Sequence, residues 1–573
     1  MEGKDWRSFY LSKPWLKFYP EGVPAEVEIP QKSIIEAFDE SIEKWGKGRV
    51  STIFYGRKIT YGELKDQSDR FATALWELGV RKGDRIALYL VNCPQFVIAL
   101  LGALRIGATV VPISPVYVSP EVRYQIEDSG SSTIVCLDLL YDKVERANVH
   151  LKNIILTSVS EYLPTFKKML GKSVLRGVYQ KMALPSPKIY EREGIYRFQD
   201  LIKKYEPRPP KVDINPQEDI AVLPYTGGTT GNPKGVMITH HYVMASRAQI
   251  AAFENHKKEG QETLIAYMPF YHIAGLGETI MASLIYGYTM VIFSTPDLDA
   301  IINAVEDYGA TYFVGSPALY EALRDFEKTD RVDWKRLKSI DSGADVLLED
   351  TAMGWQRRTG TVIIDHWGMT EFTAAMANPR HRPKLGSIGV PVPNVKAAVV
   401  HPDSTEFLPP GEIGELIVTG PHMMKGYWNR PEETREVFVE IDGERWLKTG
   451  DLVKMDDEGY FYFYDRKKDM IKYKGYSVFA REIEEVLTSH PKIKDAAVIG
   501  VPNPKVGQDI KAVIVLESEA RGRVSEEEIL KYCEERLAHY KVPKIIEFRG
   551  EIPKTDVGKV SRRELREEAE EEL

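Results

Sequence analysis

The stretch YTGGTTGNPKGV, residues 225–236, overlaps the end of an apolar run at residues 220–225 that predicts a buried strand. Its four glycines let backbone N–H groups approach a ligand closely, its three threonine hydroxyls can donate hydrogen bonds, and Lys234 adds a positive charge. Such a loop can wrap anionic oxygens, whereas a generic cluster of glycine and threonine is more often a flexible surface loop. It is not a Walker loop, because neither Gly227 nor Gly228 is followed after four residues by Gly-Lys.

The chain around this loop alternates helical and extended patterns. Residues 64–78 and 94–106 carry apolar positions at helical spacing, and each segment is followed by an apolar run, at residues 85–91 and 109–113, that predicts a strand. Such alternation is typical of a parallel sheet with crossover helices. Further strands are predicted at residues 289–293 and 311–315. We predict an α/β fold whose large N-terminal domain has parallel and mixed sheets with flanking helices.

The pattern changes to short strands and turns from about residue 395, which predicts a β-rich subdomain over residues 395–464. After the charged connector DRKKD at residues 465–469, about a hundred residues of α+β pattern predict a second, smaller domain. The expected domains are residues 1–466 and residues 467–573.

The composition excludes several classes of protein. The chain has 573 residues, and its net charge of −8, from 76 basic and 84 acidic residues, gives no electrostatic footprint for a nucleic acid partner. Cys93, Cys136 and Cys533 lie far apart and suggest neither a disulfide framework nor a zinc site, which fits a cytoplasmic setting. The charged N-terminus lacks the apolar core of a signal peptide, and the apolar run at residues 96–104 is too short to span a membrane.

The phosphate loop resembles the signature of the adenylate-forming (AMP-binding) superfamily, which contains acyl-CoA synthetases, luciferases and peptide-synthetase adenylation domains. The other family motifs follow in the same order: MPFYHIAG (268–275), SGAD (342–345), HWGMTE (366–371), KLGSIGVPVPN (384–394), WLKTGD (446–451), DRKKDMIKYKGY (465–476) and PKTDVGKVSRREL (553–565). The resemblance extends from residue 33 to the C-terminus. It implies an adenylation domain that binds ATP and an acyl group, followed by a mobile domain that carries a catalytic lysine.

The resemblance assigns the phosphate loop, two further segments and two single side chains to ATP. The loop would bind the phosphates, and the two segments would frame the adenine, with Trp367 where the family usually has a stacking tyrosine. Asp451 can accept hydrogen bonds from a ribose diol, and Arg466 has a planar charged head suited to ribose or phosphate oxygens. The assigned loop and segment residues are Thr226, Gly227, Gly228, Thr229, Thr230, Gly231, Lys234, Gly343, Ala344, Asp345, His366, Trp367, Gly368, Met369 and Thr370.

Metal binding and catalysis are expected at three of the residues. Glu371 follows a strand predicted at residues 362–364 and a turn at Gly368, and its carboxylate can hold Mg²⁺ because Mg²⁺ prefers oxygen ligands. The matching glutamate does this in the family, and we assign Thr226 to the same metal and to catalysis. Lys559 would otherwise pass as a surface lysine, but the superfamily's catalytic lysine falls at this position.

The resemblance also assigns the acyl and CoA sites. His272 by itself would more often be a core histidine. The family match places it near the substrate carboxylate, and we assign Gly389 to the same acyl pocket. The expected hinge residue is Lys468, and the expected CoA passage consists of Lys474, Gly475 and Tyr476.

A fatty acid is the expected substrate, with ATP and CoA as co-substrates. The phosphate loop and the segments at residues 15–20 and 151–205 resemble bacterial and archaeal fatty acyl-CoA ligases more than aryl-CoA ligases. His366 and Trp367 replace the common Gly-Tyr pair and add bulk beside the adenine and acyl pockets. The open alternatives are a short-chain, hydroxy or aryl acid and, outside the ligases, a nucleotide-binding ATPase or sensor. An amino acid is disfavoured because no carboxylate follows Pro269 until Glu278.

Residues 161–184 combine five basic side chains with apolar ones at helical spacing. One interpretation is an interfacial helix that docks on the inner face of an anionic membrane, and an equal alternative is a helix that packs on the protein's own body. The sequence leaves the oligomeric state open, with a homodimer as one alternative.

Overall fold

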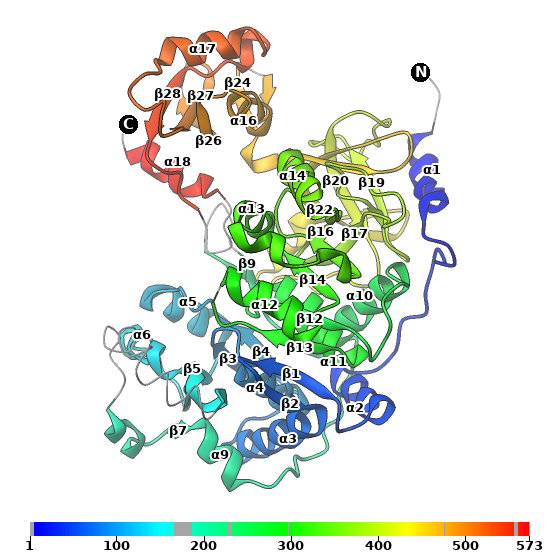
Figure 1. Ribbon diagram of the computed structural model, residues 1–573, viewed down its shortest axis with the longest axis vertical. Coiled ribbons are helices and arrows are strands. Elements are labelled where there is room, and N and C mark those ends of the chain that lie inside the picture. The colour runs from blue at the N-terminus through cyan, green and yellow to red at the C-terminus, as the bar shows by residue number, and fades with distance from the viewer. Residues whose placement is uncertain are drawn as a thin grey trace. The chain divides into compact units, whose positions relative to one another are not determined.

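The computed structural model describes residues 5–164, 186–226, 232–295, 297–474, 476–554 and 560–571 (Figure 1). The chain divides into two compact units. One comprises Trp15–Lys396 and Thr419–Phe438, and the other comprises Met1–Pro14, Ala397–Val418 and Val439–Leu573. The domain boundary predicted between residues 466 and 467 stays a prediction.

The first unit contains a seven-stranded sheet with the order β11-β8-β4-β3-β5-β6-β7. All its pairings are parallel except that of β11 with β8, because helices connect the other strands. α4 is buried along almost its whole length and packs against α3. The strands are β3 (Arg85–Tyr89), β4 (Thr109–Pro112), β5 (Thr133–Leu137), β6 (Asn153–Thr157), β7 (Ile195–Arg197), β8 (Ile220–Val222) and β11 (Ile238–Thr239). The helices are α3 (Tyr61–Glu77), α4 (Pro94–Arg105), α5 (Ser119–Ser129), α6 (Tyr141–Ala147) and α9 (Phe198–Lys204).

A nine-stranded sheet in the same unit has the order β18-β17-β16-β15-β14-β12-β13-β1-β2. One buried cluster beside it includes the ring contacts between Trp334, Trp355 and Tyr320. The strands are β1 (Val50–Phe54), β2 (Arg57–Thr60), β12 (Thr263–Ala266), β13 (Thr289–Ile292), β14 (Tyr312–Gly315), β15 (Ser339–Ser342), β16 (Ile364–Met369), β17 (Phe372–Ala377) and β18 (Val390–Pro391). The helices are α2 (Ile34–Trp45), α10 (His240–Phe253), the π-helix η5 (Gly275–Met281), α11 (Ala282–Tyr286), α12 (Leu298–Tyr308), α13 (Pro317–Asp325), α14 (Glu349–Thr359) and α15 (Pro431–Val437).

One local prediction was wrong. The strand expected at residues 362–364 begins only at Ile364 and runs through Gly368 to Met369, and the turn lies at Thr370 and Glu371. The reason is tertiary, since β17 pairs antiparallel with β16 and continues it as a strand beyond the apolar run.

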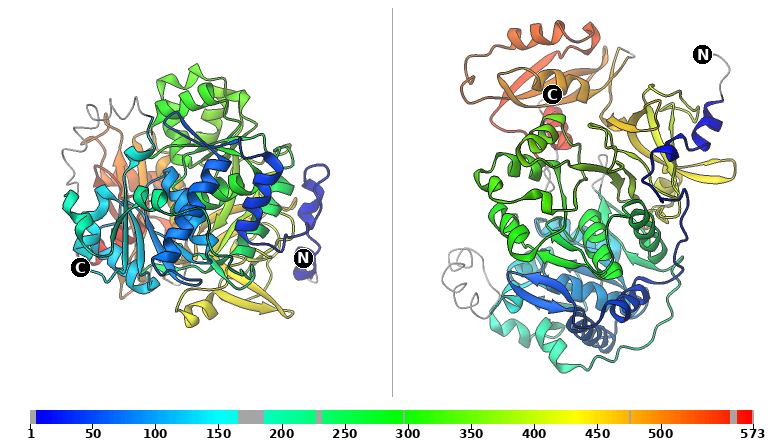
Figure 2. Two further views of the ribbon diagram at one scale, coloured as in Figure 1. Left: turned by 90° about the horizontal axis from the view of Figure 1, so that it is seen from below. Right: turned by 45° about the vertical axis from the view of Figure 1, so that its right-hand side comes forward.

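The second unit holds two sheets. In the first, β23 joins the order β19-β20-β22-β21, and helix α1 (Trp6–Leu11) lies beside this sheet through a ring contact of Tyr10 with Phe407 (Figure 2). These strands coincide with the predicted β-rich region: β19 (Lys396–Val400), β20 (Gly414–Thr419), β21 (Phe438–Ile441), β22 (Glu444–Met455) and β23 (Phe461–Arg466).

The C-terminal sheet has the order β25-β24-β27-β26, with β28 on β27, and it buries apolar faces of α16 and α17. Its elements are β24 (Ile471–Tyr473), β25 (Tyr476–Val478), α16 (Ala480–Thr488), β26 (Ile493–Asn503), β27 (Gly507–Leu516), α17 (Glu526–Glu534), β28 (Ile545–Arg549) and α18 (Arg562–Glu571).

Several predicted residues lie outside the described ones. They are Gly227, Gly228, Thr229, Thr230 and Gly231 of the phosphate loop, Gly475, Lys559, and most of the amphipathic segment at residues 161–184. Across the part of the chain that the structure describes, every helix is too short or too polar to cross a membrane.

Candidate active site

The stem of the phosphate loop is a short two-stranded ribbon. Thr226 of β9 (Tyr225–Thr226) pairs with Lys234 of β10 (Lys234–Gly235). The Tyr225 hydroxyl donates a hydrogen bond of 2.8 Å to Asp128 Oδ2, and the Trp428 N–H donates one of 2.8 Å to the Gly235 carbonyl. Both ends of the loop are thus held by contacts that the sequence pattern does not reveal.

Glu371 and Lys234 both contact the side chain of Tyr427. Glu371 is buried, with 6% of its surface exposed, and its Oε1 accepts a hydrogen bond of 2.8 Å from the Tyr427 hydroxyl. The Lys234 Nζ lies 5.2 Å from the centroid of the Tyr427 ring, within reach of a cation–π contact. Burial and the Glu371 carboxylate raise the pKa of Tyr427, so this hydroxyl stays a donor. The fold therefore brings the predicted phosphate-binding lysine and the predicted metal ligand to one place.

Helix α10 fixes the turn that carries Glu371. The Tyr242 hydroxyl donates a hydrogen bond of 2.9 Å to the Thr370 carbonyl and accepts one of 2.8 Å from the Thr373 N–H. One buried phenol therefore holds both sides of the turn between β16 and β17, which limits the movement of the glutamate.

The segments predicted to frame the adenine are adjacent in the fold. β15 and β16 are parallel neighbours, and a Cβ built on Gly343 would lie 3.6 Å from the His366 carbonyl oxygen. Ala344 has a φ of +72°, a strained conformation for a residue with a side chain. The Asp345 side chain is exposed and accepts a hydrogen bond of 2.9 Å from the Val346 N–H, whereas Trp367 is buried.

Asp451 and Arg466 belong to the other unit and lie opposite each other on β22 and β23. The Arg466 Nε lies 3.5 Å from Asp451 Oδ1, and the Asp451 side chain is largely buried. Both predicted ribose ligands are therefore positioned by one strand pair.

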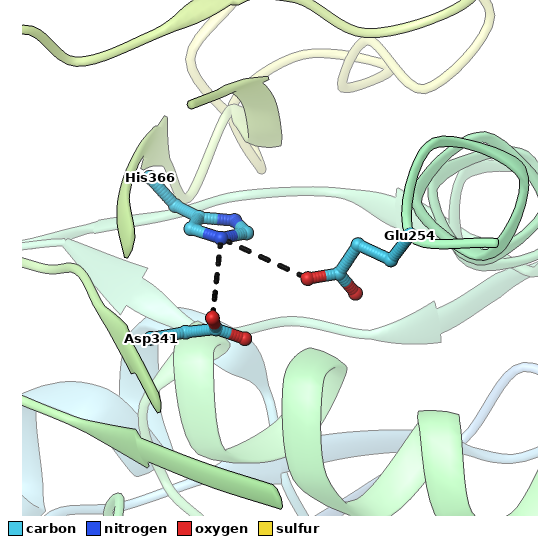
Figure 3. Close-up of side chains that lie close together, drawn as sticks. All are labelled: Glu254, Asp341 and His366. Atoms are coloured by element: carbon cyan, nitrogen blue, oxygen red, sulfur yellow. Dashed lines mark ion pairs between the residues drawn. The ribbon is translucent and has the colours of Figure 1, made fainter. Parts of the chain in front are cut away.

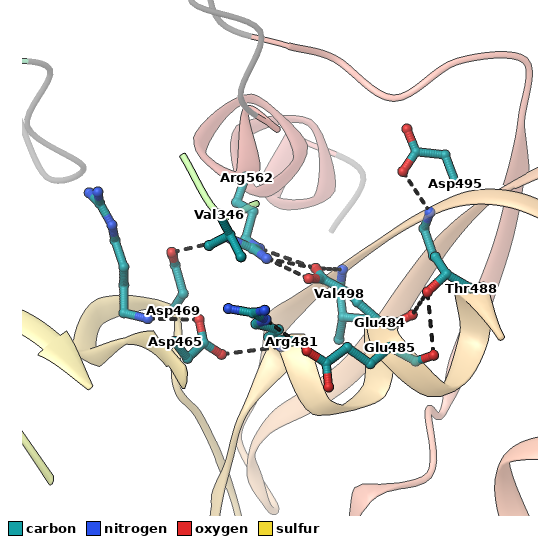
Figure 4. A network of polar contacts seen from close by, with 12 residues as sticks. Val346, Asp465, Asp469, Arg481, Glu484, Glu485, Thr488, Asp495, Val498 and Arg562 are labelled. Carbon is teal, nitrogen blue, oxygen red and sulfur yellow. Dashed lines mark hydrogen bonds and ion pairs between the residues drawn. The ribbon is translucent and has the colours of Figure 1, made fainter. Parts of the chain in front are cut away.

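The short segment η8 (Lys467–Asp469), which contains the expected hinge residue Lys468, is linked by ion pairs to helix α18 (Figure 4). Asp469 is buried and pairs with Arg562 at 3.6 Å and with Arg566. Arg562 Nη2 also lies 2.6 Å from Glu484 Oε2 of α16. α18 begins three residues after Lys559, so these pairs connect the chain beside the expected catalytic lysine to the expected hinge.

The two chain segments that flank residues 555–559, which include the expected catalytic residue Lys559, are bound to each other. Lys554 and Val560 form a β-bridge, and the Ser561 N–H donates a hydrogen bond of 2.8 Å to the Pro553 carbonyl. The described ends of residues 555–559 are therefore held together just before α18 begins.

Replacing Arg562 by glutamine is expected to destabilise the C-terminal part of the chain by about 3 kcal/mol, because buried carboxylates lose their charged partner. Arg563→Gln on the same helix is the matched control, since Arg563 pairs with Glu567 at the surface and such pairs contribute little. Scanning calorimetry of both variants measures the difference. Equal unfolding temperatures would contradict the importance of this network.

The predicted acyl-pocket residues occupy constrained loops. The His272 Nδ1 accepts a hydrogen bond of 3.3 Å from the Ala274 N–H. Gly389 has a φ of +92°, and a Cβ there would lie 2.1 Å from the carbonyl carbon of Ala377, so only glycine fits. Of the predicted CoA passage, Lys474 and Tyr476 are exposed, and the Tyr476 ring stacks on Tyr540.

His366 lies beside two carboxylates, of Glu254 and Asp341, that were not predicted from the sequence (Figure 3). Its Nε2 is 3.8 Å from Glu254 Oε1 and 3.8 Å from Asp341 Oδ1. Lys257 pairs with both carboxylates, at 3.4 Å in the case of Asp341 Oδ2. Glu254, Lys257 and Asp341 are all buried, which makes this a charged cluster inside the first unit.

Comparison with known proteins agrees with this geometry. A family model described as AMP-binding enzyme matches residues 38–428, and one described as AMP-binding enzyme C-terminal domain matches residues 482–559. The chain belongs to the AMP-binding enzyme family.

Relatives of this AMP-binding enzyme are similar over nearly their whole length. It is 38% identical to the long-chain-fatty-acid–CoA ligase of Bacillus subtilis, an alignment that covers 97% of this chain and 98% of that protein. It is 34% identical to the ligase of the same name from Escherichia coli, with 98% and 99% covered. The ATP-bound structure of MatB from Rhodopseudomonas palustris aligns with a TM-score of 0.81 at 26% identity, covering 94% of this chain and 99% of that one.

Two further residues of this AMP-binding enzyme, Tyr427 and Arg247, were not predicted from the sequence. Tyr427 lies in the tripeptide Gly-Tyr-Trp. Its position between two glycine-rich motifs was the only feature of the sequence that could have indicated a functional role. Arg247 is fully buried and pairs with Glu278 of η5 at 2.6 Å. Burial disfavours the charged guanidinium, but Glu278 more than offsets this and raises the pKa of Arg247. A lone arginine in an apolar helix carries no sign of its partner.

Proposed function

We propose that this enzyme is an AMP-forming fatty acid–CoA ligase, which converts ATP, a medium- or long-chain fatty acid and CoA into acyl-CoA, AMP and pyrophosphate. The observation that carries the proposal is the meeting of Glu371 and Lys234 at Tyr427, beside the stem of the phosphate loop. Nearly full-length similarity to relatives named long-chain-fatty-acid–CoA ligases supports the class of acid.

The chemistry requires activation of the acid. A carboxylate is a poor acyl donor, so it first attacks the α-phosphate of ATP and pyrophosphate leaves. Lys559 stabilises the negative charge that develops during this attack. The CoA thiol then attacks the acyl-adenylate and releases AMP. Because the two half-reactions need different groups around one centre, a hinged C-terminal domain with Lys468 at its hinge can deliver them in turn.

Different residues of this chain bind different parts of ATP. Lys234 and the phosphate loop bind phosphate oxygens, and Asp451 and Arg466 bind the ribose. Glu371 and Thr226 suit Mg²⁺, because a buried carboxylate and a hydroxyl are hard oxygen ligands. When bound, Mg²⁺ would neutralise phosphate charge.

The amino-acid alternative is weakened by the Arg247–Glu278 pair. Glu278 is the carboxylate that could have held a substrate ammonium, and both its oxygens bond the Arg247 guanidinium. A substrate amine would have to displace a buried arginine, which leaves an uncompensated charge.

Product analysis tests the proposal. Incubation with ATP, a fatty acid and CoA should release AMP and pyrophosphate in a reaction that depends on the acid, and should yield acyl-CoA. Release of ADP and phosphate, independent of any acid, would instead assign the chain to the ATPases or ATP sensors.

Replacing Glu371 by glutamine should lower acyl-adenylate formation by about 10²-fold at limiting Mg²⁺, because it removes a charge without changing the side-chain volume. Titration of the initial rate against Mg²⁺ measures this. Tyr427→Phe is the matched control, since it removes the hydrogen bond to Glu371 and keeps the carboxylate. Wild-type rates in Glu371→Gln at limiting Mg²⁺ would exclude a metal-binding role.

The cytoplasmic location, the membrane contact through residues 161–184 and the homodimer stay predictions. Liposome co-sedimentation before and after replacement of the basic residues by glutamine tests the membrane contact. Light scattering of the purified chain tests the homodimer.

A further inference from the structure

A cavity of about 370 Å³ lies in the first unit, against the strands that carry the adenine segments. Its inner wall includes Glu254, Ile364, His366 and Ala377, and its rim includes the exposed His381. Ile364 and His366 are two residues apart on β16, so both side chains point to the same face of the sheet. The cavity therefore lies on the face of β16 that His366 occupies.

The cavity adjoins both substrate regions of the proposed enzyme. His366 lies opposite Ala377 on the neighbouring strand, and the predicted acyl-pocket residue Gly389 packs directly on the backbone of Ala377. On the other side, the His366 carbonyl faces the predicted adenine segment at Gly343. An acyl chain joined to the α-phosphate of ATP would start beside this strand.

Charged side chains of both signs lie around the cavity. Glu254 and Asp341 bring two buried carboxylates, Lys257 supplies one buried ammonium, and the exposed Arg380 of the cavity lining supplies a guanidinium. Burial raises the pKa of Glu254 even though Lys257 opposes the rise. The arrangement therefore has spare capacity to accept a hydrogen bond.

His366 shows the same unused capacity. Its Nε2 is buried and finds no hydrogen-bond partner among the described residues. Its separation of 3.8 Å from either carboxylate oxygen exceeds a hydrogen bond. A buried polar atom without a partner costs free energy, which a ligand that bonds it would recover.

We propose that this cavity receives the distal end of the acyl chain, and that Glu254 and His366 select an acid whose distal end carries a hydroxyl group. The inference rests on the proposed function and deepens it by naming a substrate class. A hydroxyl suits the wall because it donates to a carboxylate and accepts from an imidazole N–H. An alkyl end would leave these polar atoms unpaired.

Matched pairs of acids test the inference. Pyrophosphate release is measured for unsubstituted and ω-hydroxy acids of four to twelve carbons with the full-length enzyme. At the chain length that reaches the cavity, we expect the hydroxy acid to have at least about tenfold higher kcat/KM. An unsubstituted acid that is preferred at every length would overturn the inference. Absence of pyrophosphate release with every acid would instead reject the proposed function.

Three variants assign the effect to the cavity wall. His366→Ala and Glu254→Gln should each reduce the preference for the hydroxy acid to about threefold or less, and the first should also admit longer unsubstituted chains. Glu254→Gln keeps the side-chain volume and serves if His366→Ala does not fold. His381→Ala, a histidine on the exposed rim, is the control and should keep the preference. Unchanged preference in both wall variants would overturn the inference.

A metal ion is the competing occupant, because an imidazole and two carboxylates also suit a transition metal. Thermal unfolding with added Zn²⁺ or Mn²⁺ separates the two. A rise in the unfolding temperature that disappears in His366→Ala would assign the cluster to a cation and overturn the substrate inference. No shift with either metal supports it.

Discussion

Replacing Lys559 by alanine is expected to lower the rate of acyl-adenylate formation by about 10²- to 10³-fold, the loss typical of deleting one preorganised donor. We propose that the lysine neutralises charge where the carboxylate meets the α-phosphate, and that the C-terminal domain brings it there only for the first half-reaction. The second half-reaction, from synthetic acyl-adenylate and CoA, should be largely spared. Rapid-quench measurement of each half-reaction separates the two effects.

Two results would speak against this role of Lys559. Equal slowing of both half-reactions would reject a mechanism in which the C-terminal domain changes orientation between them. Lys554→Ala is the matched control, because Lys554 lies in the stem of the same loop and pairs with Asp495 at 3.3 Å on a partly exposed surface. A comparable loss of acyl-adenylate formation in this control would mean that any substitution in the loop slows the reaction, and it would not support a specific role of Lys559.

Replacing Lys468 by proline is expected to give the opposite pattern, with adenylation retained and thioester formation lost. Proline fixes φ near −65° and removes the backbone N–H, so the proposed hinge in η8 could no longer rotate freely. The conformation required for adenylation would remain accessible, while the one required for CoA attack would not. The same pair of half-reaction assays measures this.

The control for the hinge is Lys468→Ala, which removes the exposed side chain and leaves the backbone free. It should retain both half-reactions. If alanine and proline had equal effects, the lysine side chain rather than rotation of the backbone would be responsible, and the hinge assignment would be wrong.

Local patterns predicted much of the fold. The helix at residues 94–106 and the strand at residues 109–113 match α4 and β4 within one residue, because their signals are short-range apolar periodicities. The failure at residues 362–364 is instructive. Gly368 looked like a turn, but it lies inside β16, at an irregularity between Trp367 and Met369, which both pair with β17, and such long-range pairing leaves no local mark.

In the candidate site, too, local motifs predicted single residues, whereas the contacts between them depended on the fold. Its motifs identified Glu371 and Lys234 separately, since each lies in a recognisable stretch of sequence. Their common partner Tyr427 was not predicted, because a hydrogen bond between residues 56 positions apart depends on how the sheet and the loop fold together.

The sequence by itself determined the order of the elements and the chemical groups that this enzyme has available, because periodicity and motif spacing are properties of the chain. Only the tertiary structure decided which of these groups face one another. It paired Arg247 with Glu278, joined Asp469 to Arg562, and placed His366 beside two carboxylates that share the Lys257 ammonium. Charges far apart in the sequence can be buried together only when the fold brings their partners to them, since an unpaired buried charge is too costly to persist.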